Sequence, residues 1–517
     1  MTDPSKPIDN WNSSHFYRME AWPVKSLPRH YDPTSSADIS GIPQLTGLNL
    51  MDHTSTHSPK AQALAKSWLS QCKNNKDGKH QECNKRDSDY IPTRLLDIRH
   101  AQLKSRLRLV CSELVPEVFI EDREWMTLSH CWGEWGAKEN PILVKNNLKE
   151  RQETGLEVAD LPKTFQDAIE IAGWFGINWL WIDCLCIIQD SQEDWLNEAR
   201  MMSQIYQNAQ LNVSADTGAD SRAGCFIERD EVDITPLQIG CPQISKTWMV
   251  LPDVMHMFDW MLQATSLSRA WIHRERQLAR RVLHFTAGEL VWECCGIKGT
   301  AFASETLPVG APFENGLFNM DHKYQIGRLQ QGLLEGDEET YATWNDICEN
   351  LSEKKLTKPS DMPMVLSGLA KDFSNALPGD KYIAGLWRST LPHSLLWNAR
   401  LLKDPDLEFI APSWSWLSTG AAVKLANRSS ITAKHPIATI LNEIPRSNTM
   451  IHMALWLAGI WRLRGFLGVY KYPSQIQMIV RKTLTSRYLR TTTTTMSMRY
   501  GEISGIPGTS TLAKFAS

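Results

Sequence analysis

The sequence lacks the charge, leader and membrane signals that would assign a protein to a class at once. Its 55 basic and 58 acidic residues give a net charge of −3, whereas chains that hold nucleic acid through its phosphates are usually basic. The first residues, MTDPSKPIDNW, have neither the basic nor the apolar segment of a secretory signal. The most apolar late stretch, residues 450–460, is about half as long as a membrane span. We therefore expect no nucleic-acid partner, no secretion and no membrane-spanning helix.

Cysteine usage gives no sign of a disulfide framework. The eleven cysteines are odd in number and are scattered through a long chain. Disulfide-rich proteins are usually short and secreted, whereas long chains without a secretion signal keep their thiols reduced. The sequence therefore predicts free, buried thiols and a cytoplasmic location.

One group of residues raises the question of a metal site. Cys72, His80 and Cys83 have the spacing C-x7-H-x2-C, but a structural zinc site needs about four such ligands. No fourth ligand stands near them in the sequence. Cys294 and Cys295 are adjacent on a predicted strand, so their side chains would point to opposite faces and would not chelate one ion together. We therefore expect no metal.

The composition is that of a folded protein, with 42% hydrophobic residues, 22% charged residues and 21 tryptophans. A chain of this length has room for two to four domains. The sequence pattern predicts a loose N-terminal leader, lead-in strands, a central domain, an α+β region and a low-complexity tail, over residues 1–90, 91–120, 121–295, 296–435 and 436–517. Trp387, Trp397, Trp414 and Trp416 in the fourth segment are predicted to pack a second core, and a ligand cage is the alternative.

The central domain alternates predicted strands and helices. Apolar positions recur on one helical face in residues 163–175, after Pro162 and before Gly176. Ser191 and Asp194 fit a capping box at the start of a second helix. The other predicted elements are strands at 125–131, 179–182 and 210–215, a helix at 269–281, and a hairpin of 282–285 and 290–293. Such alternation predicts an α/β domain with a mainly parallel sheet flanked by helices, followed by the α+β region.

Five sequence blocks in this domain resemble the heterokaryon incompatibility (HET) domain of filamentous fungi. They are LSHCWG at 128–133, LPKTFQDA at 161–168, LWIDCLCIIQD at 180–190, the helix at 195–209, and SRAWIHRER at 268–276 followed by RVLHF at 281–285. The order and spacing of these blocks are specific. The chain departs from the family pattern where His130 replaces the usual tyrosine, Ala270 the usual glycine, and His273-Arg274 the usual aromatic residue and glutamine.

The resemblance implies a non-self-recognition protein that triggers programmed cell death when unlike fungal cells fuse. Its partners would be other proteins of the incompatibility system, or further copies of the same chain. HET domains are thought to be similar to Toll/interleukin-receptor (TIR) domains, which implies a TIR-like or flavodoxin-like sheet. Some TIR domains cleave NAD. Three mechanisms therefore stay open: an NAD hydrolase with NAD as its substrate, an assembly module without chemistry, and an accessory of a secondary-metabolite gene cluster.

Glu198 is the candidate catalytic residue. On a helical projection it lies beside the apolar stripe that contains Trp195, where a carboxylate has a perturbed environment. In the structural interpretation, Glu198 forms a buried ion pair or a hydrogen bond with a neighbouring loop. The sequence pattern by itself favours this interpretation. By analogy with TIR domains, Glu198 would instead hold the nicotinamide ribose and stabilise an oxocarbenium-like transition state. The loop G-x-G-x-x-G is absent, so a redox dinucleotide cofactor is not expected.

Six further residues are candidates for substrate binding. Ligands of open α/β sheets bind beyond the carboxyl ends of the strands. Ser129, His130 and Trp132 come at the end of one predicted parallel strand, and Asp183 follows another. The closing block of the HET resemblance adds two candidates, Arg269 and Glu275.

Each of these candidates also has a structural interpretation. Asp183 would cap a turn, Trp132 would belong to the core, and the charged helix at 269–281 would form salt bridges with Glu289 or Glu293. A nucleophilic pair of Cys184 or Cys186 with His130 is a further alternative. The apolar neighbours of Cys186 favour a buried structural thiol instead, because a catalytic cysteine needs a partner that lowers its pKa.

Overall fold

A computed structural model divides the chain into two compact units, residues 1–331 (unit 1) and 332–517 (unit 2). Between residues 55 and 426 it describes all positions except 88, 100, 102–104, 114–122, 134–140, 230–236, 242–245, 252–263, 297–302, 306–321, 335, 392 and 401–408. Beyond that range it describes only short strands at 20–23, 439–442, 462–464, 470–471, 476–480 and 494–498. Most of the predicted leader and low-complexity tail therefore lies outside the described residues.

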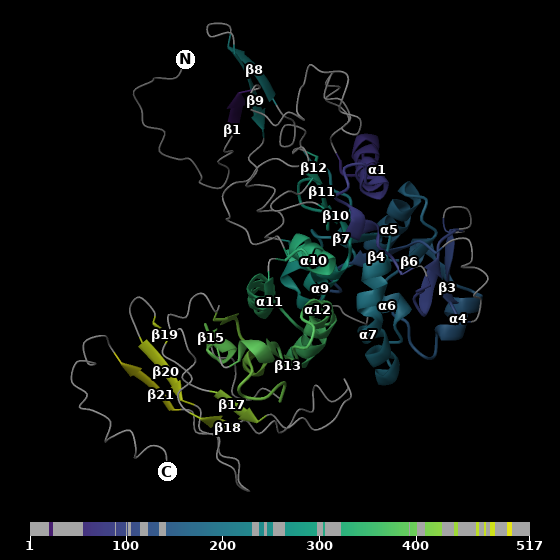
Figure 1. Cartoon of the computed structure of the whole chain (residues 1–517). Helices are drawn as coiled ribbons and strands as arrows, with labels where there is room; N and C mark the ends of the chain where they lie inside the picture. The colour runs from purple at the N-terminus through teal and green to yellow at the C-terminus, as the bar shows by residue number, and fades with distance from the viewer. Residues whose placement is uncertain are drawn as a thin grey trace, which may run out of the picture. The chain divides into compact units, whose positions relative to one another are not determined.

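The centre of unit 1 is a nine-stranded mixed sheet (Figure 1). In spatial order its strands are β12 (Ala303–Ser304), β11 (Leu290–Cys294), β10 (Arg281–Phe285), β7 (Leu211–Ala215), β4 (Trp125–Ser129), β6 (Trp179–Trp181), β2 (Arg94–Asp97), β3 (Arg106–Cys111) and β5 (Leu156–Glu157). The four central strands, β10, β7, β4 and β6, are parallel, and the other pairings are antiparallel.

The prediction of an α/β domain is confirmed, but the sheet is parallel only at its centre. The connections from β2 to β3 and from β10 to β11 are short, and short connections join antiparallel strands because a parallel pair needs a crossover of a dozen residues or more. The lead-in strands thus extend the central sheet on one side, and the predicted hairpin extends it on the other. The sequence pattern identified these strands but did not show that they all belong to one sheet.

One face of the sheet is covered by α7 (Gln192–Asn208) and α9 (Ala270–Leu278). The Trp125 indole of β4 donates a hydrogen bond to the Ile205 carbonyl of α7 at 3.1 Å. The ring of Trp181 in β6 meets Tyr206 of α7 edge to face, with the centroids 5.6 Å apart. Side chains alternate along a strand, so Ser129 lies on the same face as Trp125.

The opposite face is covered by α5 (Lys163–Trp174) and α1 (Pro59–Asn74). Phe285 of β10 lies 6.1 Å from Trp174 of α5, measured between ring centroids. Trp292 of β11 lies 6.4 Å from Trp68 of α1. Helices on both faces bury every residue of β4 and β7, which explains why these strands read as continuous apolar or small-residue runs.

The two predicted helices of the central block form close to the predicted ends. Helix α5 begins after Pro162, and Gly176 beyond its end has a φ of 66°, a left-handed conformation that suits glycine at a helix stop. Helix α7 begins after Ser191, but the Ser191 side chain makes no capping bond. The predicted capping box is therefore wrong. Asp194 instead accepts a hydrogen bond from the Ile188 amide at 2.8 Å.

The remaining elements of unit 1 are short or lie at its periphery. They are α2 (Gln81–Asn84), α4 (Leu148–Glu153), α6 (Asp183–Cys186), α10 (His322–Gln331), the 3-10 turns Val158–Asp160 and Ser266–Ser268, and a separate antiparallel sheet of β1 (Glu20–Pro23), β9 (Lys246–Leu251) and β8 (Leu237–Cys241). Among the helices of the described residues, none has the length and apolar character that a bilayer crossing needs.

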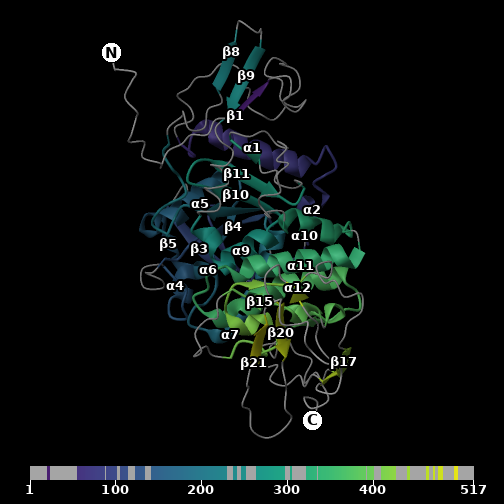
Figure 2. The ribbon, with the colours of Figure 1, turned by 90° about the vertical axis from the view of Figure 1, so that its left-hand side faces the viewer.

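Unit 2 combines helices with short strands. Helices α11 (Gly336–Ser352) and α12 (Met362–Ala376) lie side by side (Figure 2). The short elements are β13 (Tyr382–Ile383), β14 (Leu386–Trp387), β15 (Asn398–Ala399), β16 (Val423–Lys424), β17 (Thr439–Asn442), β18 (Arg462–Arg464), β19 (Tyr470–Lys471), β20 (Ile476–Val480), β21 (Thr494–Met498) and the 3-10 turns Pro359–Asp361, Arg388–Thr390, His393–Leu395 and Trp416–Thr419.

A tryptophan core holds unit 2 together. Trp344, Trp387 and Trp416 are almost fully buried, Trp397 is nearly so, and Trp414 is partly exposed. The indoles of Trp344 and Trp416 both donate to the Gly385 carbonyl, at 3.1 and 3.2 Å. The predicted second core is confirmed for the buried rings, and Gly385 is its polar anchor.

This anchor gives a prediction with an internal control. A Cβ at Gly385 would stand 2.8 Å from Trp416 Nε1, whereas a Cβ at Gly379 would meet no atom within 4 Å. Both glycines have a φ near 90°, so alanine is strained at either position. We expect Gly385→Ala to cost about 1–3 kcal/mol more than Gly379→Ala because only Gly385→Ala overpacks the core. Urea unfolding of both variants measures the difference, and equal losses would show that Trp416 can move aside freely.

Candidate functional site

The path of the chain through the sheet reverses between β4 and β7. The parallel strands stand in the order β6, β4, β7, β10, so the chain steps from β4 to one neighbour, β6, and then crosses back to the other, β7. In open α/β sheets, ligands bind at the carboxyl ends of the strands where such a reversal occurs. The predicted binding residues lie at these strand ends, or on α9 next to them. We call Ser129, His130, Trp132, Asp183, Arg269 and Glu275 the strand-end cluster.

Ser129 and Glu275 form the buried floor of the strand-end cluster. The Ser129 hydroxyl donates to Glu275 Oε2 at 2.6 Å and accepts from Asn212 Nδ2 at 3.2 Å. All three side chains are at most 4% exposed. Burial, and next the charge of Asp183, raises the pKa of Glu275 from 4.5 to about 7. A carboxyl with such a pKa exchanges a proton near neutral pH.

Asp183 stands at the carboxyl end of β6, as the first residue of α6. The Trp132 indole donates to both of its carboxylate oxygens, at 3.0 and 3.2 Å, and the Cys184 amide donates at 2.7 Å. Burial raises the pKa of Asp183 to about 6 in spite of these bonds and of the charge of Arg269. The structure therefore joins Trp132 and Asp183 directly, and it gives the cluster a second carboxyl that titrates close to neutrality.

His130 and Arg269 complete the strand-end cluster. His130 is 5% exposed and meets Phe165 edge to face, with the ring centroids 4.9 Å apart. Burial, together with the charge of Arg269, lowers the pKa of His130 to about 3, so the ring is neutral at physiological pH. Its Nε2 has no hydrogen-bond partner among the described residues. Arg269 caps the start of α9, is partly exposed, and acts electrostatically on His130, Asp183 and Glu275.

The cysteines beside the cluster do not make a nucleophilic pair. Ring and side-chain donor atoms of His130, Asp183 and Cys184 lie within 4.8 Å of one another. Burial, however, raises the pKa of Cys184 well above 9 and that of Cys186 to about 12, so both stay protonated thiols. The same three residues are a poor metal site, because the Asp183 carboxylate is already hydrogen-bonded and structural zinc needs about four ligands.

Glu198 is placed elsewhere, in a buried ion pair on α7. The Arg94 guanidinium of β2 lies 3.4 Å from Glu198 Oε1 and 2.6 Å from Asp194 Oδ2, and it also donates to the Cys186 carbonyl at 2.6 Å. Glu198 is 3% exposed, and burial raises its pKa even though Arg94 opposes the shift. This is the ion pair of the structural interpretation. The described hydrogen bonds and ion pairs do not link Glu198 to the strand-end cluster.

A second buried network of ionisable side chains involves Arg276 of α9. The sequence analysis predicted its salt bridge to Glu293 but not the contribution of Asp216 and His284. The His284 ring of β10 bonds Asp216 Oδ2 at 2.7 Å and Glu293 Oε2 at 3.3 Å, and Arg276 pairs with Glu293 at 2.8 and 3.0 Å. The predicted salt bridge of the charged helix to Glu293 is thus confirmed. Asp216 is the first residue after β7, and Asp183 is the second residue after β6, so its position at a strand end could have identified Asp216.

The comparisons with known proteins give one family match. The family model described as heterokaryon incompatibility protein (HET) matches residues 125–275. The match begins at the first residue of β4 and ends at Glu275, so it contains the whole strand-end cluster. No curated protein and no solved structure matches the chain significantly. Residues 125–275 therefore match the heterokaryon incompatibility (HET) domain family, and we call them the HET domain.

Proposed function

We propose that this HET-domain protein is an effector of heterokaryon incompatibility, which triggers programmed cell death after fusion of unlike fungal cells. The family match supports this role. The free thiols of the described cysteines support action in a reducing compartment such as the cytoplasm. Its partners would be other proteins of the incompatibility system or further copies of this chain.

We further propose that the domain acts by cleaving NAD, with the strand-end cluster as its site. The supporting observation is a pair of carboxyl groups, Glu275 and Asp183, with pKa values of about 7 and 6 beside a neutral histidine and an arginine. Perturbed carboxyls of this kind gather at catalytic sites. The strand order β6, β4, β7, β10 adds support, since it matches the 2-1-3-4 order of flavodoxin-like sheets, which bind a nucleotide cofactor where the order reverses.

The residues suit a hydrolytic cleavage of the bond between ribose and nicotinamide. Nicotinamide leaves with the electron pair of the broken C–N bond, and a water oxygen bonds to the anomeric carbon. The ionised Glu275 would accept the proton that the water loses. A second carboxylate, Asp183, would stabilise the oxocarbenium-like transition state, as paired carboxylates do in glycosidases. Arg269 would pair with phosphate oxygens of the substrate.

Two glutamates compete for the catalytic role, and one experiment separates them. The TIR analogy selects Glu198, whereas the strand-end cluster selects Glu275. We expect purified full-length protein to consume NAD, Glu275→Gln to lose at least about 100-fold in turnover, and Glu198→Gln to keep most of it. Turnover is followed by nicotinamide release, and circular dichroism establishes that both variants are folded.

Each other outcome has a distinct meaning. Loss of turnover in folded Glu198→Gln, with Glu275→Gln active, would transfer the catalytic role to Glu198. If the wild-type protein causes cell death in a fungal host but consumes no NAD, the enzyme proposal is wrong and the HET domain acts as an assembly module. If expression causes no cell death in cells that carry an incompatible partner, the effector role itself is contradicted.

A further inference from the structure

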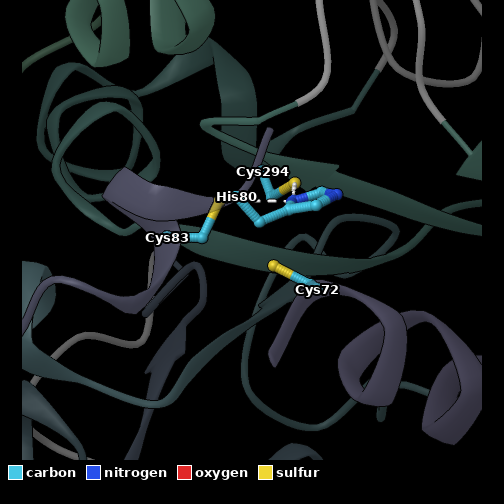
Figure 3. A group of neighbouring side chains, drawn as sticks. All are labelled: Cys72, His80, Cys83 and Cys294. Atoms are coloured by element: carbon cyan, nitrogen blue, oxygen red, sulfur yellow. Dashed lines mark hydrogen bonds between the residues drawn. The ribbon is translucent and has the colours of Figure 1, made fainter. Parts of the chain in front are cut away.

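Four potential metal ligands from three separate segments of unit 1 converge on one point. Cys72 lies in the last turn of α1, His80 and Cys83 at the start and middle of the α2 turn, and Cys294 at the end of β11. Figure 3 shows the four side chains turned toward one another around a common centre. Their donor atoms all lie within 4.8 Å of one another.

The spacing of the donor atoms fits a zinc ion. His80 Nδ1 lies 3.4 Å from Cys294 Sγ and 3.6 Å from Cys83 Sγ. In a tetrahedral site with Zn–S of about 2.3 Å and Zn–N of about 2.0–2.1 Å, nitrogen and sulfur stand about 3.5 Å apart. The two observed distances bracket that value. A group of three cysteines and one histidine is also a common ligand set of structural zinc.

The surroundings of the four residues are those of a metal site and not of an apolar thiol core. The three cysteines are at most 1% exposed. The Arg281 guanidinium donates to Cys72 Sγ at 3.1 Å, so a cationic donor lies beside this sulfur. Asp77 stands 4.0 Å from His80 Nε2. Carboxylates commonly face the outer nitrogen of a ligating histidine and orient the ring.

Gly296 provides independent support, because it keeps space free for the imidazole. A Cβ at this position would stand 2.5 Å from His80 Nδ1 and 2.7 Å from the Lys79 carbonyl. Contacts this short force the ring to move. Glycine at 296 therefore lets His80 approach Cys294, two residues earlier on the same hairpin end.

We propose that Cys72, His80, Cys83 and Cys294 bind one structural zinc ion in unit 1. Four protein ligands leave no open coordination position, so the ion stabilises the fold and takes no part in catalysis. The expectation of no metal rested on the lack of a fourth ligand nearby in the sequence, and β11 supplies that ligand from 214 positions beyond His80. Strand β11 ends at Cys294, so the predicted alternation does not extend to Cys295, which follows the strand and interacts with Cys83. Cys294 is the member of the pair whose sulfur lies within 4.8 Å of the other three donor atoms.

The proposed zinc ion has a defined structural role. It ties the segment of α1 and α2 to the hairpin that extends the parallel strands, next to β10. All four ligands lie outside residues 125–275, which the family model matches. The ion would therefore clamp the flanking segments of this chain onto the HET domain, and a fragment cut to the matched residues would lack it.

The test uses the full-length protein and does not depend on any variant. We expect about one zinc ion per chain by elemental mass spectrometry after purification from zinc-supplemented cells. X-ray absorption should give three sulfur ligands at about 2.3 Å and one nitrogen ligand. Cobalt(II) exchanged into the protein should show the intense ligand-field bands of a tetrahedral thiolate site. Wild-type protein without zinc and without these cobalt bands would overturn the proposal.

Matched cysteine variants assign the ligands. We expect the double variant Cys72→Ser with Cys294→Ser to lose at least about nine-tenths of its zinc. Cys348→Ser, which alters an equally buried thiol of unit 2, and Cys295→Ser, which alters the residue just after β11, should both keep it. Zinc retained in the double variant, or lost in Cys295→Ser while Cys294→Ser keeps it, would contradict the assignment. If the double variant does not fold, the sulfur count of the wild-type absorption spectrum decides.

Discussion

Arg276→Met is expected to destabilise unit 1 by about 3–5 kcal/mol, the usual cost of removing one partner of a buried ion pair. Arg276 and Glu293 are both at most 6% exposed and share two hydrogen bonds at 2.8 and 3.0 Å. Without the guanidinium, the Glu293 carboxylate would keep the bond from His284, at 3.3 Å, and the more diffuse attraction of the Lys323 charge. An ionised carboxylate with so little compensation is costly in a protein interior. Urea unfolding, followed by tryptophan fluorescence, measures the loss.

An exposed ion pair of the same kind serves as the control. Arg222 donates to Asp220 through two hydrogen bonds, at 3.1 and 2.6 Å, but its side chain is 57% exposed. Arg222→Met should therefore cost only about 0–1 kcal/mol. Similar losses from both substitutions would show that burial does not set the strength of the Arg276 pair. The double variant Arg276→Met with Glu293→Leu should recover most of the loss, because it removes the orphaned charge.

The pH dependence of the Arg276 effect follows from the pKa of Glu293. Burial alone would raise this pKa, but the charges of Arg276 and Lys323 outweigh burial and hold it well below 4.5. A carboxyl with a lowered pKa in the folded state stabilises above its ordinary pKa, and that contribution is lost as the pH falls through the folded value. The cost of Arg276→Met should thus be largest at neutral and alkaline pH and should shrink as the solution becomes more acidic.

The sequence predicted the local elements of the HET domain well because their patterns are local. One apolar helical face in residues 163–175 became α5, and the run at 179–182 became β6. The six binding candidates could be grouped because strand ends of a parallel sheet meet at one edge, and Ser129–Glu275 and Trp132–Asp183 are in contact.

What the sequence could not predict are contacts made across long separations. Neither the pairing of β2 with β6 nor the approach of Cys294 to His80 leaves a periodic signal. The capping box failed for a related reason. Asp194 forms an ion pair with Arg94, which lies 100 positions away in the sequence. Its carboxylate therefore takes part in a tertiary contact and not in the local capping motif. The same arginine accounts for the burial of Glu198 in an ion pair.

Glu275→Gln is expected to lower the proposed NAD turnover at least about 100-fold and to stabilise the folded protein at alkaline pH. The pKa of Glu275 rises from 4.5 to about 7 on folding, so the folded state binds the proton more tightly than the unfolded chain. Stability from this group is therefore largest below pH 4.5 and falls as the pH rises to about 7. The rise in pKa corresponds to a cost of at most about 3 kcal/mol above pH 7.

Glutamine removes the charge but keeps an oxygen that can accept the Ser129 hydroxyl. We expect Glu275→Gln and the wild type to melt at similar temperatures at pH 5, and the variant to melt several degrees higher at pH 8. Glu293→Gln is the matched control with the opposite sign. Its carboxylate is stabilised by Arg276 and Lys323, so this variant should melt lower than the wild type at pH 8.

The two readouts together decide the role of Glu275. If Glu275→Gln is more stable than the wild type but loses NAD turnover or cell killing, Glu275 is a functional residue whose ionised form destabilises the fold. If Glu275→Gln is more stable and fully active, the activity of the strand-end cluster does not depend on proton transfer by Glu275. A variant that melts lower than the wild type at pH 8 would mean that the ionised Glu275 is stabilised where it stands. In that case a carboxylate other than Glu275 would have to carry the proton, with Asp183 the nearest candidate in the cluster.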